Sequence, residues 1–104
     1  METYLATAWG DSVDAVSFKD IQNTIAATRE MDDEHGAFWV AIVEDHETVL
    51  ETQKDLTVTG IFPQTGEQIR AQMKTWAEVE GLYALLLDGN FEEVKDALNK
   101  SNSH

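Results

Sequence analysis

The sequence contains no cysteine and a single proline among its 104 residues, and these absences exclude several kinds of protein. Without cysteine there can be no disulfide framework, no thiolate nucleophile and no cysteine-ligated zinc or iron–sulfur site. This composition fits a reducing compartment. We expect a chain of this length to form one domain over residues 1–104, with a core that needs neither disulfides nor a metal.

Basic residues and long apolar runs are also scarce. Seven Lys and Arg stand against 20 Asp and Glu, which gives a net charge of −13. Because this charge repels phosphates, nucleic acids and anionic membranes are disfavoured as partners, whereas a basic protein is favoured. No apolar run approaches the roughly 20 residues of a membrane-spanning helix, and the first residues do not resemble a signal peptide. We therefore expect a cytoplasmic location.

The chain is organised around residues 37–53, AFWVAIVEDHETVLETQ. Ala37–Val43 is an unbroken apolar run of strand length, Glu44–Glu47 is a polar break, and Thr48–Gln53 resumes as a second strand. An apolar run without alternation is typical of a strand that is covered on both faces. The pattern therefore predicts a hairpin whose first strand lies at the centre of a sheet.

Two more strands and a helix are predicted on either side of this hairpin. Strands are expected at Glu2–Trp9 and Leu56–Phe62, and Gly60 within the second indicates a bulge or a close backbone approach. Ser17 is a good N-cap residue, and the apolar residues that follow it keep helical spacing over residues 18–31. The apolar side of this helix is expected to lie on the sheet.

The region after the proline is predicted to be helical. Pro63–Gly66 forms a turn, and Ile69 and Met73 begin an apolar series at helical spacing. Thr75 starts a second capping pattern, so the helix can restart there, and Gly89 is placed to end it. A short last helix follows.

These elements together predict an α+β fold. We expect a three- or four-stranded, mostly antiparallel sheet with helices packed mainly on one face, in the order β-α-β-β-β-α-α. Val13–Val16 fits either a loop or a brief extended segment, and residues 101–104 are expected to fray.

Two acid–histidine clusters are the most conspicuous candidates for chemistry. They are Asp32-Asp33-Glu34-His35 and Glu44-Asp45-His46-Glu47. Such side chains can ligate divalent metals, but the strand between the clusters separates them by roughly 25–35 Å. We therefore expect no metal site and no cofactor. The sequence also lacks a nucleophile elbow, a zinc-protease helix motif and a glycine-rich phosphate loop, so no catalytic residue is assigned and no enzyme is expected.

Candidate partner-binding residues come from the same region. Phe38 and Trp39 are adjacent on a strand and must face opposite sides of the sheet, so both cannot enter one helix-covered core. Trp39 is therefore predicted to be an apolar anchor for a partner. The densest carboxylates would supply an acidic surface for a basic partner: Asp32, Asp33, Glu34, Glu44, Asp45 and Glu47.

The order of these elements resembles small bacterial immunity proteins of polymorphic toxin systems, in particular the Imm1-like group. The resemblance lies in a first strand that ends in Trp9-Gly10, a helix capped at Ser17, and the stretches FWVAIVEDHETVLE, LTVTGIF and WAEVEGLYALLLDGNF. This chain is shorter than members of that group. The resemblance implies a non-catalytic protein that binds and neutralises a toxin, such as a nuclease or a deaminase, and it brings no catalytic residues.

Three functions are compatible with these observations. The expected one is an acidic binding protein, an immunity or inhibitor protein for a basic toxin. The alternative is a stand-alone structural or regulatory domain, with a homodimer as one form, whose acidity serves only solubility. The third is a small enzyme or metal-binding protein. Electrostatically steered binding is sensitive to salt, whereas a dimer held by apolar surface is not, so ionic strength distinguishes the first two.

Overall fold

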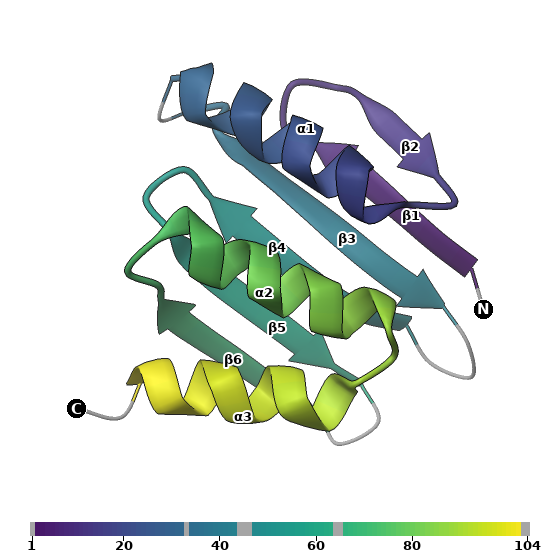
Figure 1. Ribbon diagram of the computed structural model, residues 1–104, viewed down its shortest axis with the longest axis vertical. Helices are drawn as coiled ribbons and strands as arrows, with labels where there is room; N and C mark the ends of the chain where they lie inside the picture. Colours follow the sequence, from purple (N-terminus) through teal and green to yellow (C-terminus); the bar gives the residue numbers. More distant parts are fainter. Residues whose placement is uncertain (1, 33, 44–46, 64–65, 103–104) are drawn as a thin grey trace.

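Six antiparallel strands form one sheet, and three helices lie on one of its faces (Figure 1). The computed structural model describes residues 2–32, 34–43, 47–63 and 66–102. In space the strands follow the order β2-β1-β3-β4-β5-β6. The elements are β1 (Glu2–Thr7), β2 (Ser12–Asp14), α1 (Phe18–Glu30), β3 (Ala37–Val43), β4 (Glu47–Gln53), β5 (Thr57–Phe62), β6 (Glu67–Gln72), α2 (Trp76–Leu87) and α3 (Phe91–Asn102).

The structure confirms the predicted α+β class, the antiparallel pairing and the position of the helices on one face. The predicted number of strands, three or four, is wrong, since the sheet has six. The larger error is β6, which was expected to be helical. Ile69 and Met73 are four residues apart, and this spacing satisfies a helical period and a period of two equally well. Ala71 lies between them and is also buried, whereas Gln68 and Arg70 are exposed. This alternation makes residues 67–72 a strand, and they pair with β5.

The second unpredicted strand is β2, which occupies the segment that fitted either a loop or an extended piece. Val13 lies opposite Leu5 of β1 and packs against the core, while Ser12 and Asp14 flank it on the other face. A strand of only three residues leaves little unpaired backbone at this edge of the sheet. Short edge strands of this kind limit pairing with other chains.

The helix starts predicted at Ser17 and Thr75 are confirmed, whereas the one expected directly after the turn at residues 63–66 is wrong. Ser17 accepts a hydrogen bond from the backbone N–H of Asp20, and the Asp20 carboxylate accepts one from the N–H of Ser17, which completes a capping box. Thr75 caps α2 by accepting a hydrogen bond from the N–H of Glu78, while the Glu78 carboxylate accepts one from the N–H of Lys74. Beyond α2, Gly89 adopts a φ of 80°, the left-handed conformation that commonly follows a helix.

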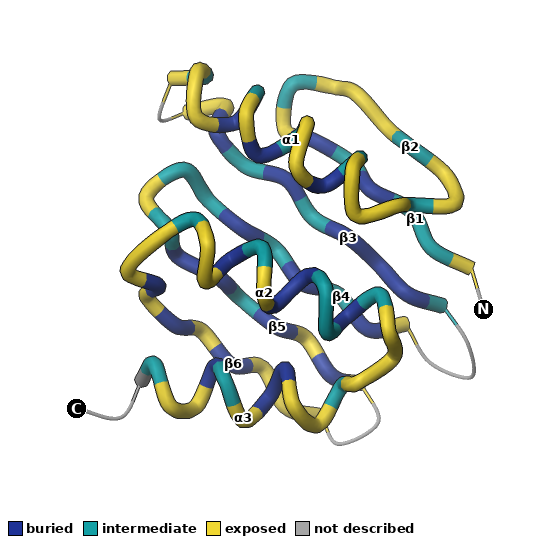
Figure 2. The backbone as a smooth tube through the Cα atoms, in the orientation of Figure 1, coloured by how far each residue is buried: buried dark blue, intermediate teal, exposed yellow. Residues whose placement is uncertain are grey.

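The core lies between the sheet and the helices, whose outer sides are exposed (Figure 2). Phe38, Val40 and Ile42 of β3 point into it and are almost fully buried. Tyr83 of α2 packs on Phe38 with ring centroids 5.2 Å apart. Its hydroxyl donates to the carbonyl oxygen of Leu50 at 3.0 Å and is 2.7 Å from the Thr52 hydroxyl. This pairing satisfies the one polar atom that α2 buries over the centre of the sheet.

Gly60 leaves room for two side chains of the core. A Cβ at this position would lie 2.8 Å from Leu98 of α3 and 2.7 Å from the ring of Phe62. Lys95 of the same helix lies 5.1 Å from the centroid of the Phe62 ring and 3.6 Å from the Glu67 carboxylate. The side chains of Phe62 and Leu98 therefore fill the space over Gly60, and α3 packs on β5 and β6.

No helix among the described residues combines the length and the apolar character that crossing a bilayer requires.

Two isoleucines on opposite faces of the sheet give a matched test of this arrangement. Ile42 is 1% exposed beneath the helices, whereas Ile61 of β5 is 39% exposed on the other face. We expect Ile42→Ala to lower the free energy of unfolding by about 2–5 kcal/mol because it leaves a cavity, and Ile61→Ala to cost less than about 1 kcal/mol. Urea denaturation of both variants measures the difference. A loss below about 0.5 kcal/mol for Ile42→Ala would mean that β3 is not central to the core.

Candidate functional site: the open face of the sheet

The face of the sheet opposite the helices is covered by no described element (Figure 1). Successive side chains of a strand point to opposite faces. Since Phe38, Val40 and Ile42 point toward the helices, Trp39 and Ala41 point to the other side. The unbroken apolar run of β3 predicted a strand covered on both faces, but within the described chain only one face is covered. We call the other side the open face.

Apolar side chains extend over four neighbouring strands of the open face. Tyr4, Ala41, Val49 and Ile61 form one row across β1, β3, β4 and β5. Ala41 is 0% exposed although it lies on the uncovered side, so its larger neighbours close over it. The apolar patch consists of Tyr4, Ala6, Trp39, Ala41, Val43, Val49 and Ile61.

Tyr4 reaches across β3 to an acidic residue. Its hydroxyl donates a hydrogen bond of 2.6 Å to the carboxylate of Glu47 on β4. The small side chain of Ala41, directly opposite Tyr4 on β3, leaves room for the ring to pass. The hydrogen bond to Glu47, followed by partial burial and the negative charge, raises the pKa of the Tyr4 phenol above its ordinary value. This bond ties three strands together on the open face.

Four carboxylates accompany the apolar patch: Glu2 on β1, Asp14 on β2, and Glu47 and Glu51 on β4. No Lys or Arg of the described residues forms an ion pair with any of them. Arg70, on β6, is the only basic residue among the described strand residues of this face. The half of the open face formed by β2, β1, β3 and β4 is therefore acidic and apolar.

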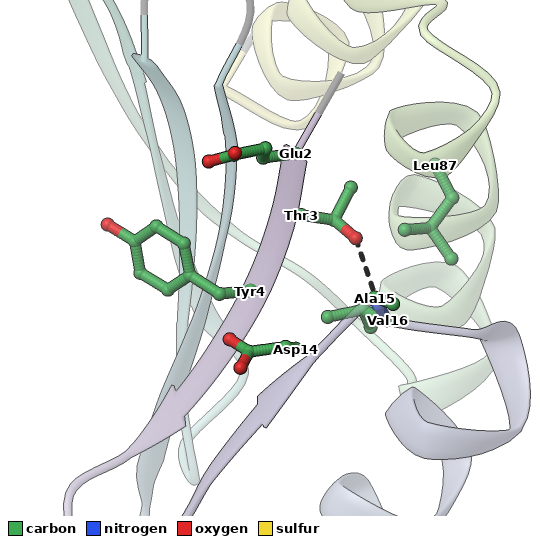
Figure 3. A pocket seen from close by; sticks show the side chains of 7 residues that line it. All are labelled: Glu2, Thr3, Tyr4, Asp14, Ala15, Val16 and Leu87. Carbon is green, nitrogen blue, oxygen red and sulfur yellow. Dashed lines mark hydrogen bonds between the residues drawn. The ribbon is translucent and has the colours of Figure 1, made fainter.

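A hollow of about 690 Å³ lies at the outer edge of this half (Figure 3). Ala15, directly after β2, has a φ of 52°. The chain turns away from β1 there, and the pairing between β1 and β2 ends. The Thr3 hydroxyl accepts a hydrogen bond of 2.9 Å from the N–H of Val16 and holds this turn. Figure 3 shows Glu2, Tyr4 and Asp14 on one side of β1, with Thr3 and Leu87 on the other. The lining residues are Glu2, Thr3, Tyr4, Asp14, Ala15, Val16 and Leu87.

Of the described residues that were predicted to bind a partner, two lie on the open face. Trp39 and Glu47 share the open face, and the side chain of Trp39 is half-buried. Asp32 and Glu34 lie in the loop between α1 and β3, at the opposite end of β3 from Glu47. The remaining three predicted residues lie outside the described part of the chain: Asp33, Glu44 and Asp45.

The carboxylate of Asp32 already has local partners. It accepts hydrogen bonds of 2.9 Å from the backbone N–H of His35 and lies 2.9 Å from Nδ1 of the same residue. These bonds, with a smaller contribution from the charge of Lys54, hold the pKa of Asp32 below its ordinary value. Lys54 also donates to the carbonyl oxygen of Met31, so this loop carries its own cation. Asp32 therefore stabilises a turn.

Metal binding finds no support in this geometry. No group of three or more His, Asp or Glu side chains among the described residues could hold a metal ion. Among the described carboxylates the ring of His35 pairs with Asp32 alone, and His46 lies outside the described residues.

Sequence reasoning missed most of the open face. The alternation in β1 places Tyr4 and Ala6 on one side of that strand. The alternation in β5 places Ile61 on the face that Val58 does not share. Joining these half-patterns needs the strand order, because Tyr4 and Ile61 meet only through the pairing of four strands. Glu51 and Asp14 carried no local signal, since each is an isolated carboxylate within a strand.

Comparison with known proteins identifies no relative, since no family model matches the sequence and no match was found among curated proteins or solved structures. The resemblance to immunity proteins therefore stays a prediction.

The bond between Tyr4 and Glu47 can be tested by titrating the phenol. The chain has two tyrosines, and burial raises the pKa of Tyr83 well above its ordinary value, so the folded protein reports Tyr4 first as pH rises. We expect Glu47→Gln to lower the pKa of Tyr4 toward its ordinary value, because the carboxylate acceptor is lost. Absorbance of the tyrosinate or NMR of the ring carbons measures this change.

Glu51→Gln is the matched control for that titration. It removes the same charge from the same strand and face without touching the hydrogen bond of Tyr4. We expect it to change the pKa of Tyr4 less than Glu47→Gln does. Equal changes in the two variants would show that charge alone, and not the hydrogen bond, sets the pKa.

Proposed function

We propose that this chain is a non-catalytic binding protein and that the open face is its interface for a basic protein. The observation that carries the proposal is the apolar, uncovered side of β3. Its seven residues are all apolar, which is typical of a strand buried on both faces, yet no described element covers the side that holds Trp39, Ala41 and Val43. A contiguous apolar patch rimmed by polar residues is a common mark of a protein-binding surface.

The charges around the patch select the kind of partner. Glu2, Asp14, Glu47 and Glu51 surround or interrupt the patch and have no cation in the described chain. Burying these carboxylates against an apolar or acidic surface would be costly, whereas Lys and Arg side chains of a partner would compensate them. The net charge of −13 would also accelerate encounter with a basic protein.

The same charges disfavour a dimer formed through the open face. Stacking two copies would bring both sets of four carboxylates into one interface and join two chains that each carry a net charge of −13. Like charges placed opposite each other at an interface cost several kcal/mol. The alternative of a homodimer therefore fits this face less well than a basic partner does.

A toxin that acts on nucleic acid would be a suitable partner. Such enzymes present basic surfaces to phosphates, and an acidic face could occupy that surface in place of the substrate. This step rests on the resemblance to immunity proteins, which implies binding to a nuclease or a deaminase. Within this proposal the carboxylates steer and orient the complex, and the apolar patch supplies the buried area.

Surface-based kinetics against a basic protein encoded by a neighbouring gene tests the proposal. The double variant Glu2→Gln, Asp14→Asn is expected to slow association several-fold at low salt and to lose most of that effect at high salt. Trp39→Ala is expected instead to speed dissociation by roughly 30-fold, the equivalent of about 2 kcal/mol, if the side chain is a central anchor.

Two further variants separate the open face from overall charge. Glu93→Gln with Asp96→Asn removes the same charge from exposed positions of α3, on the helix side of the molecule, and is expected to change association much less. Reversing Asp32 and Glu34 to Lys tests the loop between α1 and β3 separately. Equal effects from α3 and from the open face, or no effect of Trp39→Ala on a folded protein, would contradict the proposed interface. A stable dimer that Trp39→Ala dissociates would favour the structural alternative.

A further inference from the structure

We propose that Trp39 and Glu51 together form a receptor for one arginine side chain of the partner. This inference rests on the proposed function, because it uses the open face as the interface. It adds the chemistry of the contact, which is a guanidinium held between an indole ring and a carboxylate. The two residues lie directly opposite each other in the ladder between β3 and β4, and both are half-buried.

The spacing of this pair suits a guanidinium. Side chains directly opposite each other on antiparallel strands have Cβ atoms about 4.5–5.5 Å apart. A flat cation can therefore lie against the ring of Trp39 while its N–H groups reach the oxygens of Glu51. Arginine suits this arrangement better than lysine because its guanidinium is planar, weakly hydrated and able to donate two parallel hydrogen bonds.

Both members of the pair are available for a ligand. Among the described residues the indole N–H of Trp39 has no hydrogen-bond partner, whereas that of Trp9 donates to Asp11 at 2.8 Å. The carboxylate of Glu51 likewise has no ion pair or hydrogen bond to the described residues. Glu47, on the same strand and face, differs because it accepts the hydroxyl hydrogen of Tyr4.

The surroundings of the pair leave it open and short of positive charge. In the same row across the sheet, Ala6 lies beside Trp39 and Thr59 lies beside Glu51, and both of these side chains are small. Arg70 ends the row on β6. Its Cα lies two strands, about 10 Å, from that of Glu51, and the side chains of these two described residues form no ion pair. A cation from outside the chain can therefore reach the pair, and partial burial there strengthens its attraction to the ring and the carboxylate.

An NMR titration tests the receptor without a partner protein. The probes are N-acetyl-arginine methylamide and N-acetyl-lysine methylamide at low salt, and the signals are the indole N–H of Trp39 and the side chain of Glu51. We expect saturable shifts with the arginine probe and an affinity at least about threefold lower for the lysine probe. The indole signals of Trp9 and Trp76 serve as internal controls and should shift little.

Variants then assign the effect to the pair. Glu51→Gln is expected to weaken the arginine probe at least about fivefold, and Trp39→Leu at least about threefold, whereas Trp39→Phe should keep part of the binding. Glu47→Gln is the matched control, because it removes the same charge from the same strand and face. It should change the affinity by less than about twofold.

The inference is overturned if arginine and lysine bind equally, or if Glu51→Gln and Glu47→Gln weaken binding equally, because either result indicates general attraction to an acidic surface. The comparison of arginine with lysine uses the unaltered protein, so it stands even if a variant does not fold. Failure here is separable from failure of the proposed function. A basic protein that still binds through Trp39 and the acidic rim would leave the function in place and remove only the arginine receptor.

Discussion

The pairing of β3 between β1 and β4 is the constraint on which the rest of the structure depends. Every side chain of β3 is apolar, so burial of either face of this strand is favourable. In the observed register Phe38, Val40 and Ile42 point toward the helices. This register also determines which residues of the neighbouring strands face the core. A shift by one residue would exchange the two faces of the strand. The core and the open face are therefore two results of one register.

The two faces reach stability by different means. The helix side excludes water with large side chains and satisfies its buried hydroxyl through Tyr83 and Thr52. The open face keeps most of its apolar side chains half-buried and places carboxylates beside them, with Tyr4 closing over Ala41. In the proposed function, the carboxylates keep this surface hydrated and disfavour association between copies, since like charges would meet. The apolar surface thereby stays available for the proposed basic partner.

Much of the fold could be predicted from the sequence because its local signals are strong. The unbroken run Ala37–Val43 and the caps Ser17 and Thr75 lie where they were expected. The strand β6 was predicted as a helix because Ile69 and Met73 fit both periods. The alternation of buried Ala71 with exposed Gln68 and Arg70, together with the free edge of β5, favours the strand. The position of Trp39 outside the core could be predicted because its neighbour Phe38 must face the opposite side of the sheet. The pair that it forms with Glu51 depends on the register between two strands, which no local pattern contains.

The route of the chain through the sheet has a consequence for how the open face is assembled. The strands β3 to β6 are joined by successive hairpins and can form from contacts that are near in sequence. In contrast, β1 pairs with β3 only after the chain has passed through β2 and α1. Because the segment between β1 and β3 is longer than a hairpin loop, bringing its ends together has a greater entropic cost. We expect the N-terminal strand to dock late during folding. Tyr4 and Ala6 would then complete the apolar patch last, and a chain that has not finished folding would present only part of its binding surface.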